Sequence, residues 1–284
     1  MTSLVIGGNG FLGSHLVREL LADGTAVRVL TRPTSDLRTI AGLDVDHVTG
    51  TLFDTDTLAR ALRGIDTVYH CAVDTRAWLR DSAPLYRTNV EALRSVLDAA
   101  VGAELDAFVF TSSMATIGRH PGRVVDETDE FNWESAATGY VRSRVAGERL
   151  ALGYAARGRV PVSALCVSNT YGPGDVGPTP HGQFVAGAAL GKLPFTVRGV
   201  RAECVAVDDA ARALIAAARR GRPGERYIVS ERFLDLGDVI ATAARAAGRR
   251  PPRRVLPRPA LSVAGTLGSA WAAVSGRSPQ LTAH

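Results

Sequence analysis

Short apolar runs alternate with stretches of helical periodicity along the first 167 residues of the chain. Runs that lack alternating polar residues are typical of strands buried on both faces of a sheet. Strand and helix in regular alternation predict a parallel sheet with helices on both faces. The predicted strands span residues 4–6, 26–30, 45–48, 67–70, 107–110 and 160–167, and the main helices span residues 14–22, 57–62, 84–101 and 140–157.

The pattern changes after Val167, where glycine and proline become frequent and the elements become shorter. We therefore predict a doubly wound α/β domain over residues 1–167 and a smaller lobe over residues 168–284. Residues 202–220 and 226–229 are expected to pack back on the first domain. The elements expected in the lobe are a short helix at 184–190, strands at 203–207 and 226–229, and helices at 210–220, 235–247 and 257–275.

A glycine-rich turn joins the first predicted strand to the first predicted helix. It reads LVIGGNGFLG, in which Gly7, Gly10 and Gly13 fit G-x-x-G-x-x-G, while Gly8 in place of Gly7 fits G-x-G-x-x-G. Glycines allow the backbone to approach a pyrophosphate, and a helix N-terminus presents free N–H groups to it. The same glycines also suit a plain tight turn, but their place between strand and helix predicts a Rossmann-like dinucleotide site.

The end of the second predicted strand indicates which dinucleotide is bound. Sites that prefer NAD often carry an acidic residue there, whereas this strand ends in Thr31 and Arg32, with Asp36 several residues further on. An arginine can pair with a 2′-phosphate through two hydrogen bonds, although it can also simply face solvent. We therefore expect NADP(H) in preference to NAD(H).

Net charge and cysteine usage restrict the class of protein. The charge of +5 and the pI near 9.5 come from scattered basic residues, so we expect anionic cofactors or substrates and no nucleic acid. The cysteines stand at positions 71, 166 and 204 without a C-x-x-C pair, which is typical of reduced thiols and not of a zinc site or disulfide framework. No apolar run is long enough for a signal peptide or a membrane span, so a cytoplasmic enzyme is expected.

Candidate catalytic residues follow the fifth predicted strand and begin the helix after it. Thr111, Ser112 and Ser113 come directly after an apolar run, and side chains at the carboxyl end of a parallel strand face the ligand crevice. Tyr140 and Arg144 are four residues apart and so project from one face of a helix. Asn89, within the predicted helix 84–101, either orients a buried water or a backbone carbonyl near the site or lies on an exposed face.

Six segments in order resemble the extended short-chain dehydrogenase/reductase family, which includes nucleotide-sugar epimerases and dehydratases and dihydroflavonol-type reductases. GGNGFLG resembles the cofactor loop, VYHCA the strand beside the nicotinamide, and YRTNV the helix that carries the family's asparagine. VFTSSMATIG resembles the strand with the catalytic hydroxyl, SNTYGPGD the segment after the sixth strand that contacts the nicotinamide, and CVAVDDAARAL the strand and helix of the substrate lobe. The resemblance implies that the cofactor contacts Gly7, Gly10, Phe11, Leu12, Gly13, Ala72, Asn89, Tyr140 and Arg144.

The resemblance also implies proton transfer coupled to hydride transfer. Tyr140 would exchange a proton with the substrate oxygen, and Ser113 would hydrogen-bond that oxygen. In the family a lysine binds the nicotinamide ribose and lowers the pKa of the tyrosine, which is otherwise about 10. Here Arg144 stands at the lysine position; it keeps the charge but cannot pass on a proton. Three outcomes follow. The enzyme works normally with Arg144 in place of the lysine, or Tyr140 acts as acid without a full proton relay. In the third, the protein binds the dinucleotide without turnover.

The leading hypothesis is an NADP(H)-dependent oxidoreductase that interconverts ketone and alcohol groups on a small or medium organic molecule. A nucleotide-sugar epimerase or dehydratase is the alternative, for which Arg198 and Arg201 could bind a substrate pyrophosphate. A non-catalytic NADP(H)-binding protein is the third hypothesis, because of Arg144.

Further expectations come from the same resemblance. Thr51 replaces the acidic residue that often binds the adenine amino group, and Asp54 either substitutes for that residue or is a loop residue. Helices 84–101 and 140–157 are expected to pair across a two-fold axis in a homodimer. Because the chain ends soon after residues 278–282, the substrate lobe is expected to be open or to be closed by a partner chain.

Overall fold

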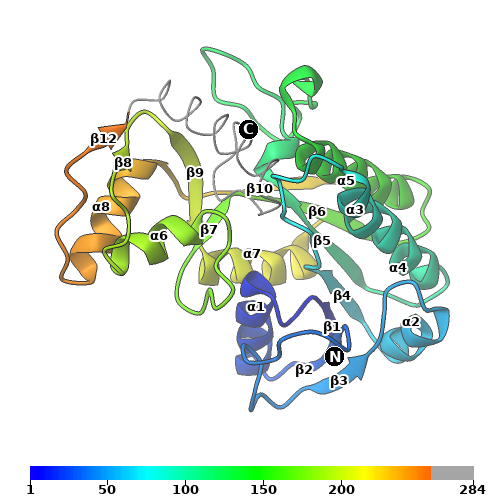
Figure 1. Ribbon diagram of the computed structural model, residues 1–284. Helices are drawn as coiled ribbons and strands as arrows, with labels where there is room; N and C mark the ends of the chain where they lie inside the picture. Colours follow the sequence, from blue (N-terminus) through cyan, green and yellow to red (C-terminus); the bar gives the residue numbers. More distant parts are fainter. Residues whose placement is uncertain (257–284) are drawn as a thin grey trace.

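The computed structural model describes residues 1–256 (Figure 1). Within this range, a seven-stranded sheet has the order β10-β6-β5-β4-β1-β2-β3, and every neighbouring pair in it is parallel. The predicted α/β class and its parallel sheet are confirmed. The strands are β1 (Thr2–Ile6), β2 (Ala26–Thr31), β3 (Asp46–Thr49), β4 (Thr67–His70), β5 (Ala107–Ser113), β6 (Val162–Val167) and β10 (Arg226–Val229).

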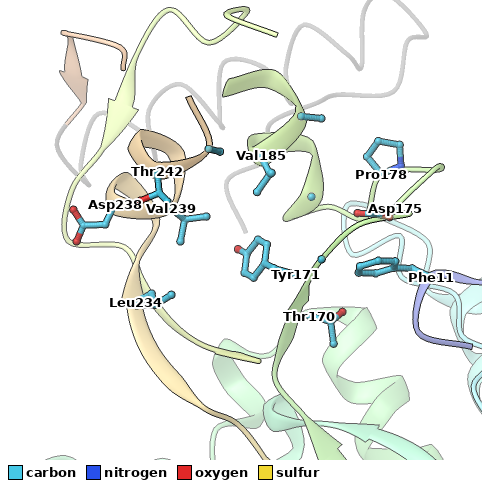
Figure 2. Close-up of a pocket in the computed structure, with 14 residues that line it drawn as sticks. Phe11, Thr170, Tyr171, Asp175, Pro178, Val185, Leu234, Asp238, Val239 and Thr242 are labelled. Carbon is cyan, nitrogen blue, oxygen red and sulfur yellow. The ribbon is translucent and has the colours of Figure 1, made fainter. Parts of the chain in front are cut away.

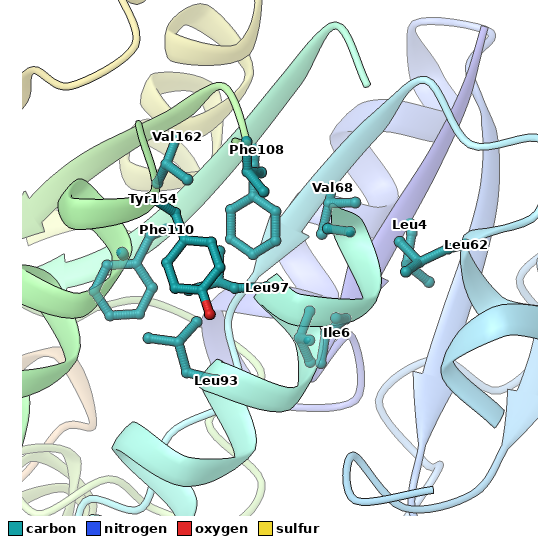
Figure 3. Close-up of a cluster of buried hydrophobic side chains, with 14 of the residues drawn as sticks. Leu4, Ile6, Leu62, Val68, Leu93, Leu97, Phe108, Phe110, Tyr154 and Val162 are labelled. Atoms are coloured by element: carbon teal, nitrogen blue, oxygen red, sulfur yellow. The ribbon is translucent and has the colours of Figure 1, made fainter. Parts of the chain in front are cut away.

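Helices cover both faces of the sheet, as the apolar runs predict. Neighbouring residues of β1 divide between the faces: Leu4 and Ile6 pack in one buried cluster and Val5 in the other. The cluster around Leu4, which also contains Phe108 and Phe110, is drawn in Figure 3. One face is covered by α2 (Thr55–Leu62), α4 (Ala92–Ala100) and α5 (Gly139–Ala156), and the other by α1 (Phe11–Ala22) and α7 (Val207–Arg220).

The predicted helix 84–101 is interrupted. It consists of α3 (Ala83–Tyr86), a π-helical segment η1 (Arg87–Glu91) and α4. A π-helical turn carries an extra residue and often marks a functional site. Here it lies around Asn89, whose side chain is only 1% exposed, so the alternative of an exposed face for Asn89 is wrong.

The hydroxyl run at the end of the fifth strand belongs to the strand and does not follow it. Thr111, Ser112 and Ser113 pair with residues 165–167 of β6, so β5 is three residues longer than the apolar run alone predicts. A short 3-10 helix, η2 (Met114–Thr116), begins immediately afterwards, and a second, η3 (Glu134–Ala136), precedes α5. Ser113 is thereby placed at the carboxyl edge of the sheet.

The C-terminal lobe holds two small sheets beside the main one. Strands β7 (Asn169–Tyr171), β9 (Arg201–Ala206) and β11 (Arg232–Asp235) form one, and β8 (Thr196–Val197) and β12 (Val255–Leu256) form the other. Helices α6 (Gly182–Ala189) and α8 (Leu236–Ala246) pack together over them (Figure 1). The helix predicted at 257–275 lies outside the described residues, and the division at residue 167 stays a prediction.

Candidate active site

The glycine turn lies against the end of β4. Gly7 has a positive φ of 81°, and a Cβ on it would lie 2.8 Å from the backbone nitrogen of Ala72. A Cβ on Gly13 would collide with the carbonyl oxygen of Gly7. Both positions therefore require glycine, and Ala72 forms one side of the same narrow space.

The first turn of α1 is open to a ligand. Gly10 occupies the N-cap without a side-chain cap, and its N–H donates to the carbonyl oxygen of Gly7 at 3.0 Å. The N–H groups of Phe11, Leu12 and Gly13 have no acceptor within the helix because they belong to its first turn. Free N–H groups at the positive end of a helix fit a pyrophosphate, so this turn can hold a dinucleotide.

Arg32 lies exposed directly after β2. The nearby carboxylate of Asp36 is bound by Arg38, with Oδ2 and Nη2 2.6 Å apart, and this hydrogen bond lowers the pKa of Asp36. Asp36 is thus engaged elsewhere, and Arg32 remains the candidate partner for a 2′-phosphate. Asp54 caps α2, where it accepts from the hydroxyl of Thr57 at 2.5 Å, so it acts as a helix cap.

Asn89 joins the segment after β4 to the start of α5. Its Oδ1 accepts from the N–H of Asp74 at 2.8 Å, and its Nδ2 donates to the Asp74 carbonyl oxygen at 3.1 Å and to the Ser143 hydroxyl at 3.0 Å. The Ser143 hydroxyl in turn donates to the carbonyl oxygen of Tyr140 at 2.7 Å. The amide therefore orients backbone groups, and its predicted contact with the cofactor stays a prediction.

Ser113 keeps a hydrogen available for a ligand. Its Oγ accepts from the N–H of Ala115 at 3.2 Å, so the hydroxyl proton is free to donate. Tyr140, in the first turn of α5, is half-buried and packs with Ala115 on a cluster that includes Phe131 and Val145. The structure thus brings the Tyr140 ring and the segment that follows Ser113 onto one cluster.

Arg144 is buried one helical turn after Tyr140, with 2% of its surface exposed. Its Nη2 donates to the carbonyl oxygen of Thr111, and its Cζ lies 5.2 Å from the centre of the Phe110 ring. Its Nε has no hydrogen-bond partner, and no carboxylate among residues 1–256 forms an ion pair with it. The guanidinium is therefore fixed on β5 with an unbalanced charge.

His70, at the end of β4, and Cys71, which follows it, are both uncharged at neutral pH. Burial, to which the charge of Arg144 adds, lowers the pKa of His70 to about 3, and neither ring nitrogen has a partner. Burial raises the pKa of Cys71 to about 11, so its thiol stays protonated at neutral pH. Cys71 is therefore a small packed side chain and not a nucleophile.

Glu148 is a buried carboxylate that the sequence analysis did not single out. It accepts hydrogen bonds from the hydroxyls of Ser112 and Thr116, the latter at 2.8 Å, and from the Cys166 thiol at 3.3 Å. The Arg226 guanidinium on β10 lies 3.2 Å from its Oε1. Four elements of the sheet region are thus joined at one side chain.

This network lies next to the catalytic candidates. Ser112 precedes Ser113, and the hydroxyl oxygen of Thr116 also lies 2.7 Å from the Ser113 carbonyl oxygen, so its one proton is shared between this oxygen and Glu148. Glu148 continues the four-residue spacing of Tyr140 and Arg144 along α5, so helical periodicity could have indicated it. Arg226 is far away in the sequence, and no local pattern points to it.

Comparisons with known proteins agree with this geometry. A model of the NAD dependent epimerase/dehydratase family matches residues 3–230. A Synechocystis protein named for dihydroflavonol 4-reductase is 32% identical over 89% of this chain and 74% of its own length. Sterol demethylase protein B of Methylococcus capsulatus is 30% identical over 90% of this chain and 78% of its own length. The structure of Thermus thermophilus UDP-glucose 4-epimerase in complex with NAD is 26% identical, with a TM-score of 0.78, over 92% of this chain and 88% of that one.

The fold and the glycine turn define a dinucleotide-binding protein of the α/β class. The chain belongs to the NAD dependent epimerase/dehydratase family, and the extended short-chain dehydrogenase/reductase resemblance is confirmed. It is therefore an NAD(P)-dependent oxidoreductase or epimerase by class. No helix within residues 1–256 is long and apolar enough to cross a membrane.

Proposed function

We propose that the protein is an NADP(H)-dependent oxidoreductase that interconverts ketone and alcohol groups on a small or medium organic molecule. The observation that carries this proposal is the free hydroxyl proton of Ser113 at the edge of the sheet where the glycine turn opens. The nicotinamide, when bound, supplies or accepts the hydride. Ser113 donates to the substrate oxygen, and Tyr140 gives that oxygen a proton or takes one from it.

Arg144 has a positioning and electrostatic role in this proposal. It keeps the positive charge of the lysine that the family resemblance implies at this position. Its hydrogen bond to the Thr111 carbonyl oxygen holds it against β5, two residues before Ser113. A guanidinium held in this way cannot relay a proton, so Tyr140 must be reprotonated by solvent.

A reductase is favoured over a nucleotide-sugar enzyme by the basic residues of the lobe. The side chain of Arg201 is 65% exposed, and its Nε lies 3.9 Å from Oδ2 of Asp235. Arg198 is also exposed. Neither guanidinium is held in place for a substrate pyrophosphate. The relative named for dihydroflavonol 4-reductase supports the same choice, whereas the structural relative named UDP-glucose 4-epimerase supports the alternative.

A non-catalytic NADP(H)-binding protein is the second candidate, and the fixed, unbalanced guanidinium of Arg144 favours it. The consumption of NADPH by the wild type and by Arg144→Lys, measured by absorbance against a panel of ketones and aldehydes, separates the two. We expect the wild type to oxidise NADPH with at least one carbonyl compound. Activity that appears only in Arg144→Lys would contradict the oxidoreductase proposal and support the binding protein.

Removal of the Arg32 side chain is expected to reduce the preference for NADP(H). Arg32→Ala should raise the Kd of NADPH by roughly 10- to 100-fold, since a charge-assisted hydrogen bond to phosphate is lost. The Kd of NADH should not change, because NADH has no 2′-phosphate. Titration calorimetry with both cofactors measures this, and Arg94→Ala, an exposed arginine on α4, is the control. Tighter binding of NADH than of NADPH, by the wild type and by Arg32→Ala alike, would overturn the assignment of NADP(H).

A further inference from the structure

A cavity of about 510 Å³ lies between the glycine turn and the C-terminal lobe (Figure 2). Its volume is within the range of small-molecule sites. Figure 2 shows the Tyr171 ring in the middle of the view, between Phe11 on one side and Leu234 and Val239 on the other, with Val185 of α6 above it. The apolar lining includes Phe11, Tyr171, Val185, Leu234, Val239 and Ala243.

The charges around this cavity have one sign. Asp175 and Asp238 are the charged side chains in its described lining, and no lysine or arginine lines it. Asp175 accepts from the N–H and the hydroxyl of Thr179 at 2.8–3.1 Å, whereas Asp238 is exposed in the first turn of α8. Burial raises the pKa of Tyr171 to about 12, so its hydroxyl is uncharged. A phosphate or carboxylate would meet repulsion here and find no cation among the lining residues within 1–256.

The cavity is within reach of the catalytic candidates. Val167 on β6 pairs with Ser113, and Thr170, which lines the cavity, is three residues further along the chain. Three residues of extended chain span at most about 10 Å. Phe11 lines the cavity and also belongs to the open first turn of α1, so the cavity adjoins the cofactor turn. One elongated molecule can therefore reach both Ser113 and the cavity.

We propose that this cavity binds an uncharged, apolar part of the substrate, a ring system or an alkyl chain, and that it rejects phosphorylated and nucleotide-linked molecules. The occupant is a small molecule because the lining is concave and joined to the cofactor turn. The statement that the ligand is a substrate rests on the proposed oxidoreductase function. The preference for a neutral over an anionic ligand does not rest on it.

The test compares two fluorescent probes that share one ring system. N-phenyl-1-naphthylamine is neutral, and 1-anilinonaphthalene-8-sulfonate carries one negative charge. Titrated into the full chain at low ionic strength, the neutral probe should bind at least about ten-fold more tightly, because the apolar contacts are shared and the repulsion is not. Asp238→Asn should tighten binding of the sulfonate about two- to five-fold and leave the neutral probe unchanged.

A second experiment fills the cavity with a larger side chain and measures binding of the neutral probe. Ala243→Trp should weaken the neutral probe by at least about ten-fold, whereas Ala246→Trp, at an exposed position on α8, should not. Val185→Trp serves the same purpose from α6 if Ala243→Trp does not fold, as judged by its melting curve. Equal binding of both probes, or a neutral probe unaffected by both filling variants, would overturn the proposal.

Turnover distinguishes this proposal from the oxidoreductase function. Probe binding as expected without NADPH oxidation by any carbonyl compound would overturn the function and leave the cavity assignment standing. NADPH oxidation that is faster with phosphorylated ketones than with neutral apolar ones would support the oxidoreductase function and overturn the cavity assignment. Faster oxidation of the neutral apolar ketones, reduced in Ala243→Trp but not in Ala246→Trp, would support both.

Discussion

Tyr140→Phe is expected to lower kcat for NADPH-dependent carbonyl reduction by about 100- to 10,000-fold, the usual contribution of a positioned acid. The ring would still pack on the cluster around Phe131, so the fold and the Kd of NADPH should be retained. The phenol proton is what the substitution removes. Steady-state kinetics and cofactor titration of the same preparation measure both quantities.

Tyr227→Phe is the matched control for this substitution. Tyr227 lies on β10, and its hydroxyl accepts from the Arg222 N–H at 2.9 Å, away from Ser113. The control should keep the wild-type kcat. If Tyr140→Phe also kept it, Tyr140 would not be the acid, and Ser113 or solvent would have to supply the proton.

Glu148→Ala is expected to lower the free energy of unfolding by about 3–5 kcal/mol, because it removes the buried partner of the Arg226 guanidinium and leaves it only the exposed carboxylate of Glu130, with Oε1 3.9 Å away, and backbone carbonyl oxygens. The side chains of Glu148 and Arg226 are 5% and 9% exposed, so water cannot replace the lost partner easily. The hydroxyls of Ser112 and Thr116 lose their acceptor at the same time. Urea unfolding followed by tryptophan fluorescence measures the change.

Two further variants show whether this loss comes from the buried pair. Glu104→Ala, at an exposed position in the turn before β5, should change the free energy of unfolding by less than about 0.5 kcal/mol. Combining Glu148→Ala with Arg226→Leu should recover part of the loss, since the guanidinium that lost its buried partner is then absent. A loss below about 1 kcal/mol in Glu148→Ala would mean that the pair contributes little to stability.

The fold could be predicted because its signals are local. Apolar runs such as 107–110 lack an alternating polar residue, as strands buried on both faces do, and the glycines of the first turn stand where close backbone contacts exclude a Cβ. Tyr140 and Arg144 were placed on one helix face by their spacing alone. These features depend on neighbours within a few residues, which a sequence displays directly.

The remaining features depend on contacts between distant residues. The pair of Glu148 and Arg226 joins positions 78 residues apart, and the lobe strands β7, β8 and β12 are too short to show a period. The π-helical segment at Arg87–Glu91 is a shift in backbone hydrogen bonding that no residue type marks. The cavity is assembled from α1, α6, β7, β11 and α8, so its shape exists only in the fold. The homodimer through α4 and α5 stays a prediction.

The place of β10 in the main sheet has a consequence for the nascent chain. All six residues of β6 are buried, and β10 covers the edge of β6 that faces away from β5. During synthesis, β6 leaves the ribosome long before residues 226–229 do, so its edge stays unpaired while residues 168–225 are added. Unpaired apolar edges recruit other strands. The buried strand β6 therefore gains its last neighbour only when residues 226–229 have been added.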